Sequence, residues 1–80
     1  MDTNVFSYIL AVADSKSISG AARQLFMSQP ALTKQLGKLE SELGFKIFDR
    51  SHSPLTVTEK GKIFLEFAVK YQELEKELNC

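Results

Sequence analysis

Polar side chains of the kinds that contact nucleic acids recur along one face of a predicted helix. Gln29, Thr33 and Lys34 share that face, Lys38 lies one turn later, and Pro30 stands near the start. A glutamine amide can pair with adenine and a lysine ammonium can reach guanine, while threonine and proline can contact a thymine methyl. The residue types and their spacing therefore favour a surface that reads base edges in a DNA major groove.

The formal net charge of the chain is zero, yet its positive charge is concentrated in two segments. Residues 16–38 hold four basic side chains and no acidic one, and residues 50–62 hold three basic side chains, one glutamate and one histidine. A neutral total is therefore compatible with a basic face. The alternative is an ordinary helical hairpin with charges scattered over a solvated polar surface. In that case we expect some acidic residues within residues 16–38, and there are none.

Residues able to carry out catalysis or to hold a metal are scarce. The chain has one histidine, His52, and one cysteine, Cys80, and it contains no glycine-rich phosphate loop. Catalysis needs several convergent titratable groups, and a zinc site needs about three or four ligands. We therefore predict no enzyme activity, no metal and no cofactor, and we interpret His52 as a solvated or phosphate-facing turn residue.

Signals for a membrane or secreted location are missing from the sequence. No apolar run approaches the roughly 18 residues of a membrane span, and the first residues lack the features of a secretory signal. A single cysteine excludes an internal disulfide framework and suits a reducing compartment. These features predict one small cytoplasmic domain.

Two short helices are predicted ahead of the polar face. Asp2 or Thr3 can cap the first helix, and Ser17 can cap the second, because their side-chain oxygens accept free backbone N–H groups. Apolar residues at helical spacing give each helix one buried side. They are Val5, Phe6, Ile9, Leu10 and Ala13 in the first helix, and Ala21, Ala22 and Leu25 in the second.

The third helix carries the polar face. A tight turn at Phe26 and Met27 precedes it, Ser28 can cap it, and Pro30 falls in its first turn, where a missing N–H has no cost. Gly44 ends it. Its inner side is the continuous stripe formed by Leu32, Leu36, Leu39 and Leu43.

A small β-hairpin is predicted next, with strands at residues 45–50 and 55–57 and a turn that contains Pro54. Arg50, His52 and Ser53 lie at this turn, where they can touch a DNA backbone or minor groove. For Arg50 an internal ion pair, with Asp49 or with a carboxylate of a helix, is an equally good interpretation.

Thr58 can cap a final long helix over residues 59–79. Five of its apolar residues alternate at spacings of three and four, which is the pattern of a coiled-coil seam and predicts a dimer interface. These residues are Phe64, Phe67, Tyr71, Leu74 and Leu78. Further apolar residues widen the stripe, so part of this helix is expected to pack on its own domain.

These motifs together resemble the amino-terminal domain of the LysR-type transcriptional regulators. The family pattern is matched by Ser28-Gln29-Pro30-Ala31-Leu32-Thr33-Lys34-Gln35-Leu36, Leu39-Glu40, Leu43-Gly44, Ile47-Phe48-Asp49-Arg50 and Thr58-Glu59-Lys60-Gly61. The resemblance covers nearly the whole chain. It implies a mainly α fold with a small β-hairpin, namely a winged helix-turn-helix at residues 1–58 followed by a long dimerisation helix at residues 59–80.

The resemblance also implies a function, which is sequence-specific binding of double-stranded DNA by a homodimer whose long helices usually pack antiparallel. A dimer of this kind suits a palindromic site. Contacts are expected from the third helix and from the wing, and Ser17 and Ser28 are expected to hold the helix starts and reach phosphates. The matching contact positions are Gln29, Pro30, Thr33, Lys34, Arg50 and Ser53. The alternative function is a winged-helix module that docks a protein.

Family members continue into a domain that binds a small-molecule effector, and this chain stops at Cys80, so it resembles an isolated DNA-binding domain. The sequence departs from the family pattern at three places. Ser53 and Pro54 replace the usual basic residue and glycine of the wing tip, and Gly20 replaces a larger residue. Gly37 costs the third helix about 1 kcal/mol relative to alanine.

Overall fold

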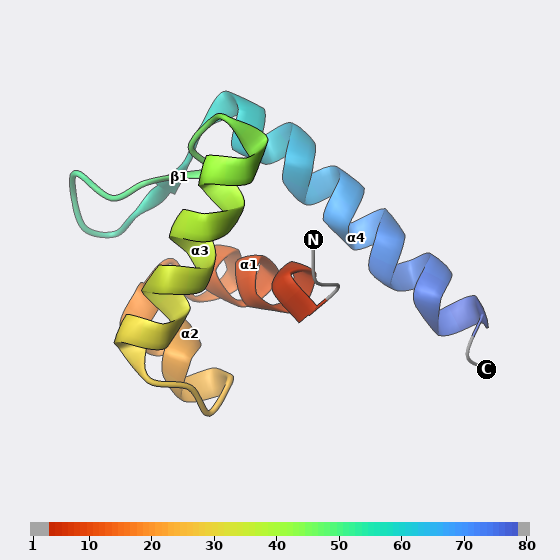
Figure 1. The fold of residues 1–80 in the computed structure, drawn as a ribbon, viewed down its shortest axis with the longest axis horizontal. Coiled ribbons are helices and arrows are strands. Elements are labelled where there is room, and N and C mark those ends of the chain that lie inside the picture. Colours follow the sequence, from red (N-terminus) through yellow and green to blue (C-terminus); the bar gives the residue numbers. More distant parts are fainter. Residues whose placement is uncertain (1–3, 79–80) are drawn as a thin grey trace.

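The computed structural model describes residues 4–78, which form four helices and one small hairpin (Figure 1). In chain order the elements are α1 (Asn4–Ser15), α2 (Ile18–Gln24), α3 (Gln29–Leu43), β1 (Phe48–Asp49), β2 (Thr56–Val57) and α4 (Glu59–Leu78). This is the predicted order, so the mainly α fold with a hairpin is confirmed. The predicted cap at Asp2 or Thr3 and the predicted end of α4 at Asn79 lie outside the described residues.

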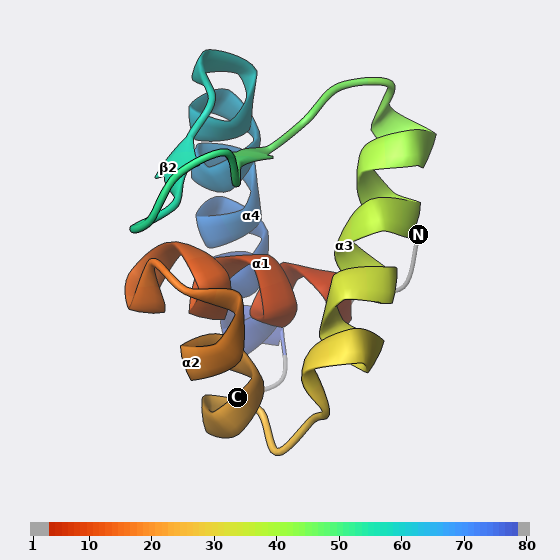
Figure 2. The same ribbon diagram turned by 90° about the vertical axis from the view of Figure 1, so that its left-hand side faces the viewer.

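The core forms where α1, α2 and α3 meet. Ile9, Val12, Ala21, Leu32 and Leu36 are completely buried there. Burial of each large aliphatic side chain contributes about 1.5–3 kcal/mol to stability. α1 lies between α3 and α4 in both views, so it is the element on which the other long helices pack (Figures 1 and 2).

Three predicted helix boundaries are confirmed by their hydrogen bonds. Ser17 Oγ accepts a bond from the Gly20 amide at 3.1 Å, and Ser28 Oγ accepts one from the Ala31 amide at 3.2 Å. Gly44 ends α3 in the left-handed conformation, with φ of 80°, which favours glycine. The turn between α2 and α3 is made by Phe26, which also has positive φ and is 98 % exposed.

The strands are shorter than the sequence predicts. Only Phe48 and Asp49 pair with Val57 and Thr56, whereas the predicted strands covered residues 45–50 and 55–57. Ile47 lies opposite Thr58 in the same register and its carbonyl accepts the Thr58 amide, but its own amide donates to the Glu40 carboxylate and so makes no bond across the hairpin. The hairpin therefore starts only at β1, and its loop extends away from the body as a wing (Figure 1).

α4 is attached to the body at two places. At its start, Thr58 Oγ1 accepts the Gly61 amide and donates to the Lys46 carbonyl, which confirms the predicted cap. Further along, the Phe6 ring of α1 contacts the rings of Phe64 and Tyr71, with centroids 6.0 Å and 4.7 Å away. Beyond these contacts α4 extends as an arm (Figure 1). None of the helices within residues 4–78 is long and apolar enough to cross a membrane.

Candidate nucleic-acid interface

The outer face of α3 presents all five polar and proline side chains that the sequence places there. Its leucines point into the core, with Leu32 and Leu36 completely buried. The helix therefore has one anchored side and one free side, as in an element that enters a groove. The exposed residues of the free side are Gln29, Pro30, Thr33, Lys34 and Lys38.

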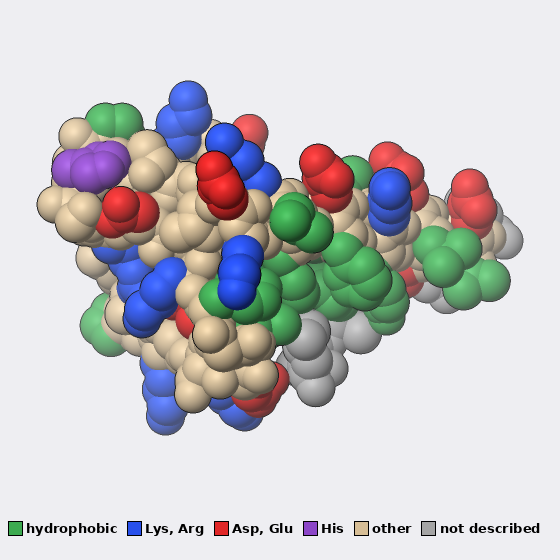
Figure 3. Space-filling model, turned by 90° about the horizontal axis from the view of Figure 1, so that it is seen from above, with side chains coloured by type: hydrophobic (Ala, Val, Ile, Leu, Met, Phe, Trp, Pro, Cys, Tyr) green, Lys and Arg blue, Asp and Glu red, His purple; other side chains and the backbone are tan. Residues whose placement is uncertain are grey.

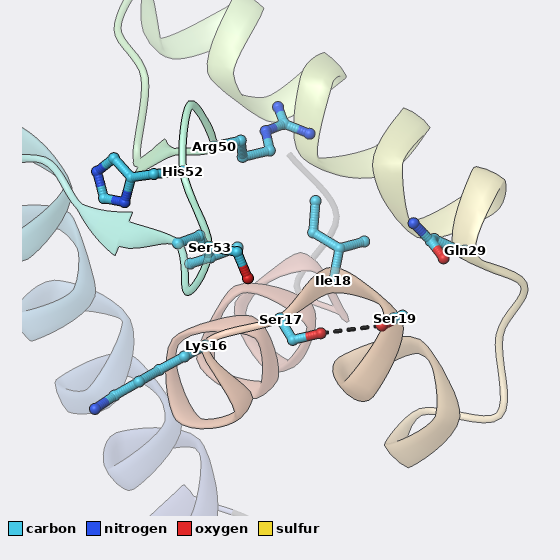
Figure 4. Close-up of a pocket in the computed structure, with 9 residues that line it drawn as sticks. Lys16, Ser17, Ile18, Ser19, Gln29, Arg50, His52 and Ser53 are labelled. Atoms are coloured by element: carbon cyan, nitrogen blue, oxygen red, sulfur yellow. Dashed lines mark hydrogen bonds between the residues drawn. The ribbon is translucent and has the colours of Figure 1, made fainter.

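A notch of about 220 Å³ lies beside this face, between α2, the start of α3 and the wing (Figure 4). Five of the residues that the sequence predicts to contact DNA line it together, although they are separated in the chain by up to 36 residues. They are Ser17, Gln29, Arg50, His52 and Ser53. Lys16, Ile18, Ser19 and Leu55 complete the lining. Hydroxyl and basic groups dominate its polar atoms, so the notch suits a negatively charged, oxygen-rich ligand.

The notch is built by the local structure at the start of α2. Ser17 accepts from the Gly20 amide, and its hydroxyl also lies 3.0 Å from that of Ser19 (Figure 4). Ser53 approaches from the wing and directs its hydroxyl toward this segment (Figure 4). A β-carbon added at Gly20 would meet Ser15 and Ser17 only at ordinary contact distances of 3.5–3.6 Å, so the glycine is not required for space.

Arg50 makes the internal ion pair that was one of its two interpretations. Its Nη2 lies 3.0 Å from Oε1 of Glu40 on α3, and 31 % of its side chain remains exposed at the notch. Sequence reasoning missed Glu40 as a functional candidate. One signal was available, because Glu40 follows Leu36 by four residues and precedes Leu43 by three, so it continues the buried stripe.

The turn of the wing is held by Asp49. Its Oδ1 accepts the Ser51 hydroxyl at 2.6 Å and the Ser51 amide at 2.9 Å. These bonds stabilise the carboxylate and lower the pKa of Asp49 below its ordinary value of 3.8, and the bond from the hydroxyl has the larger effect. His52 lies near, with Nε2 3.9 Å from Asp49 Oδ2 and Nδ1 3.2 Å from the Pro54 carbonyl. The wing tip therefore carries a carboxylate close to its only histidine.

The five residues of the predicted seam on α4 fall into two groups. Phe64 and Tyr71 pack against Phe6 and are partly buried, whereas the other three stay largely exposed, although the Phe67 ring also meets the Phe6 ring edge-on, with centroids 5.9 Å apart. The exposed fractions are 55 % for Phe67, 54 % for Leu74 and 77 % for Leu78, and Ile63 joins them at 70 %. Figure 3 shows hydrophobic side chains gathered in a band along this helix, with charged side chains along its other edge. Cys80 lies outside the described residues.

The comparisons with known proteins agree with this architecture. Residues 3–62 match the family described as bacterial regulatory helix-turn-helix protein, lysR family. The chain is 43 % identical over 68 residues to the uncharacterized HTH-type transcriptional regulator YcgK of Bacillus subtilis, covering 85 % of this chain and 21 % of that protein. It is 38 % identical over 74 residues to the regulator TcbR of Pseudomonas sp. strain P51, covering 92 % of this chain and 25 % of that protein.

Two solved structures are similar over almost the entire chain. The BenM DNA-binding domain in complex with benA site 1 DNA has a TM-score of 0.94 at 31 % identity, covering 98 % of this chain and 88 % of that one. The CbnR DNA-binding domain in complex with DNA has a TM-score of 0.93 at 35 % identity, covering 99 % and 91 %. The chain thus spans about a quarter of the full-length regulators and nearly all of these two domains. It belongs to the LysR family of bacterial helix-turn-helix regulatory proteins.

Proposed function

We propose that this chain binds double-stranded DNA sequence-specifically, as the DNA-binding domain of a bacterial transcriptional regulator that works in the cytoplasm. The observation that carries the proposal is the free polar face of α3 beside the notch. The two similar domains described above were solved with DNA bound, which supports the same role for this fold here. A protein-docking role for the same face is not favoured by these similarities.

Each group of side chains has a distinct part in the proposal. Gln29, Thr33 and Lys34 contact base edges in the major groove, and Pro30 contacts a thymine methyl. Residues at helix starts and at the wing contact phosphate or sugar, which sets the position of the protein on the duplex without reading sequence. This second group comprises Ser17, Ser28, Lys38, Arg50, His52 and Ser53.

We further propose that two copies associate through α4, with residues 1–58 serving as the DNA-binding unit. The exposed apolar residues Ile63, Phe67, Leu74 and Leu78 recur on one side of α4, and their burial against a second copy would remove them from water. A two-fold dimer presents two copies of α3, so it matches a palindromic site with related half-sites.

Selection of bound sequences from random duplex DNA, followed by gel shifts at several salt concentrations, tests the proposed function. The selected site is expected to bind more tightly than random duplex. The absence of binding to any duplex at low salt would contradict DNA binding and would favour the protein-docking alternative.

Lys34→Ala tests base reading by α3. Loss of a base contact costs about 1–3 kcal/mol and relaxes the sequence preference at one position of the site. Lys70→Ala is a matched control, because it removes the same charge from an exposed position on α4. Equal affinities of the two variants for the selected site would exclude Lys34 from base reading.

Lys38→Ala tests a phosphate contact. It is expected to weaken binding to all sequences alike and to reduce the slope of log affinity against log salt by about one unit. Gel shifts of this variant on the selected site and on random duplex, across a salt series, measure both effects. An unchanged slope would show that Lys38 does not neutralise a phosphate.

A further inference from the structure

Glu40 is the charged residue that the fold buries most completely within residues 4–78. Only 4 % of its surface is exposed, and on α3 it belongs to the buried stripe, at the edge of that stripe that faces the polar side of the helix. A buried carboxylate is strongly unfavourable unless hydrogen bonds or a cation compensate for the lost water. Its partners therefore indicate what it does.

The two carboxylate oxygens of Glu40 have different partners. Oε2 accepts the backbone amides of Ile47 and Phe48, at 2.7 Å and 3.3 Å. Oε1 accepts a bond from Arg50 Nη2 at 3.0 Å. Lys46 Nζ is 4.0 Å away, but its side chain is 73 % exposed. One side chain of α3 thus holds both the segment that enters the wing and the arginine of the wing.

The position of Glu40 on α3 relates the wing to the polar face. Glu40 follows Thr33 by seven residues, so the two lie on nearly the same side of the helix, about 10 Å apart along its axis. Arg50 extends toward α3, and both Arg50 and Gln29 line the notch (Figure 4). The Glu40 carboxylate therefore holds Arg50 on the same side of the molecule as the base-reading residues.

We propose that Glu40 is a positioning residue for DNA binding, which orients Arg50 so that its remaining N–H groups reach the DNA backbone at the notch. This inference rests on the proposed function. A guanidinium has five N–H donors in a planar fork, so one edge can bind Glu40 while the other binds a phosphate oxygen. Glu40 itself does not touch the DNA.

The direction in which Glu40→Gln changes the DNA affinity distinguishes a positioning role of Glu40 from a simple effect of its negative charge. Glu40→Gln removes a negative charge near the DNA, and Coulomb attraction alone would then strengthen binding. Positioning predicts the opposite, because the glutamine oxygen can still accept the Ile47 amide while its NH2 group cannot pair with Arg50. We expect the affinity for the selected site to fall about tenfold, within the range of couplings between residues in contact.

The experiment is a double-substitution cycle on the full chain, measured on a site selected from random DNA. Glu40→Gln and Arg50→Gln are each measured alone and then together. Because Glu40 acts through Arg50, the combined variant is expected to bind no more weakly than Arg50→Gln. If the affinity losses of the two single variants multiply in the combined variant, or if Glu40→Gln binds more tightly than the wild-type chain, the proposal is overturned.

Arg50→Lys keeps the inference testable if Glu40→Gln does not fold. Lysine keeps the charge, but its three donors all lie on one nitrogen, so it cannot span Glu40 and a phosphate as the planar guanidinium fork does. We expect Arg50→Lys to lose about as much affinity as Arg50→Gln, with folding checked by circular dichroism. Lys46→Gln is the matched control, since it removes the exposed cation near the same carboxylate. Wild-type affinity of Arg50→Lys would overturn the proposal.

Footprinting of the DNA backbone distinguishes the loss of the Arg50 contact from a general loss of the folded structure. In Glu40→Gln the protection of the backbone next to the wing is expected to disappear, while protection at the bases read by α3 persists. Loss of both would indicate a purely structural role and would contradict the inference. If the wild-type chain binds no duplex, the proposed function itself fails. If the wild-type chain binds and Glu40→Gln binds equally well, only the inference fails.

Discussion

Single residues decide where the elements of this small fold can approach each other, and two glycines have opposite roles. A β-carbon added at Gly61 would collide with the Ile47 carbonyl, so the start of α4 approaches the loop before β1 only because position 61 is glycine. A β-carbon at Gly37 meets nothing within 4 Å. The close approach at Gly61 joins segments 14 residues apart, so the local pattern around Gly61 does not reveal it.

Alanine substitutions at these two glycines are expected to act in opposite directions. Gly61→Ala overfills a tight contact with backbone and should lower the free energy of unfolding by about 1–3 kcal/mol. Gly37→Ala should raise it by up to about 1 kcal/mol, because alanine is the better helix former. Urea denaturation of both variants at one protein concentration measures the changes. Destabilisation by Gly37→Ala would show that α3 needs the glycine for another contact.

At the scale of elements, the helices were predictable and the wing was predictable only in part. Ser17, Ser28, Thr58 and Gly44 mark helix ends through hydrogen bonds within a few residues, which local sequence patterns capture well. The length of β1 depends on Glu40, which takes the Ile47 amide seven residues away and so removes it from the strand ladder. Contacts of this kind depend on the tertiary fold, which explains why the sequence predicted the exposed polar face of α3 but missed the connection of the wing to α3 through Glu40.

The turn of the wing is expected to weaken in acid. The hydrogen bonds from Ser51 hold the pKa of Asp49 below 3.8 in the folded chain. The contribution of the carboxylate to folding is therefore fully present above pH 3.8 and is lost as the pH falls through the lower folded-state pKa. An NMR titration of the Ser51 amide should show a midpoint below 3.8.

Ser51→Ala provides the control for this titration. The substitution removes the hydroxyl, which is the larger cause of the shift, and leaves the backbone amide bond. The Asp49 side-chain resonance should then titrate at a higher pH than in the wild-type chain. Identical midpoints would show that the Ser51 hydroxyl does not stabilise the carboxylate.

At the scale of the whole molecule, α1 fixes the position of α3 relative to α4. It contacts α3 on one side and α4 on the other, and the ring of Phe6 anchors the arm through Phe64 and Tyr71. Part of the heptad pattern in the sequence therefore reflects packing inside the domain. In the proposed dimer, this fixed geometry would determine the distance between the two copies of α3.

Leu74→Glu tests the proposed dimer. A charge placed in the exposed apolar stripe of α4 should oppose burial against a second copy, so sedimentation should show a shift from dimer to monomer. Val69→Glu is the matched control, because Val69 is a similarly exposed apolar residue, at 43 %, on a different side of α4. A Leu74→Glu variant with the sedimentation behaviour of the wild-type chain would contradict the interface.

The stacking of Tyr71 on Phe6 has a practical consequence. The chain has two tyrosines and no tryptophan, so tyrosine emission is not masked by a stronger fluorophore. The Tyr71 ring lies 4.7 Å from the Phe6 ring at the junction of α1 and α4, whereas Tyr8 is on α1 itself. A Tyr8→Phe background would make the intrinsic fluorescence a one-residue optical reporter of whether the arm remains docked, without an attached dye.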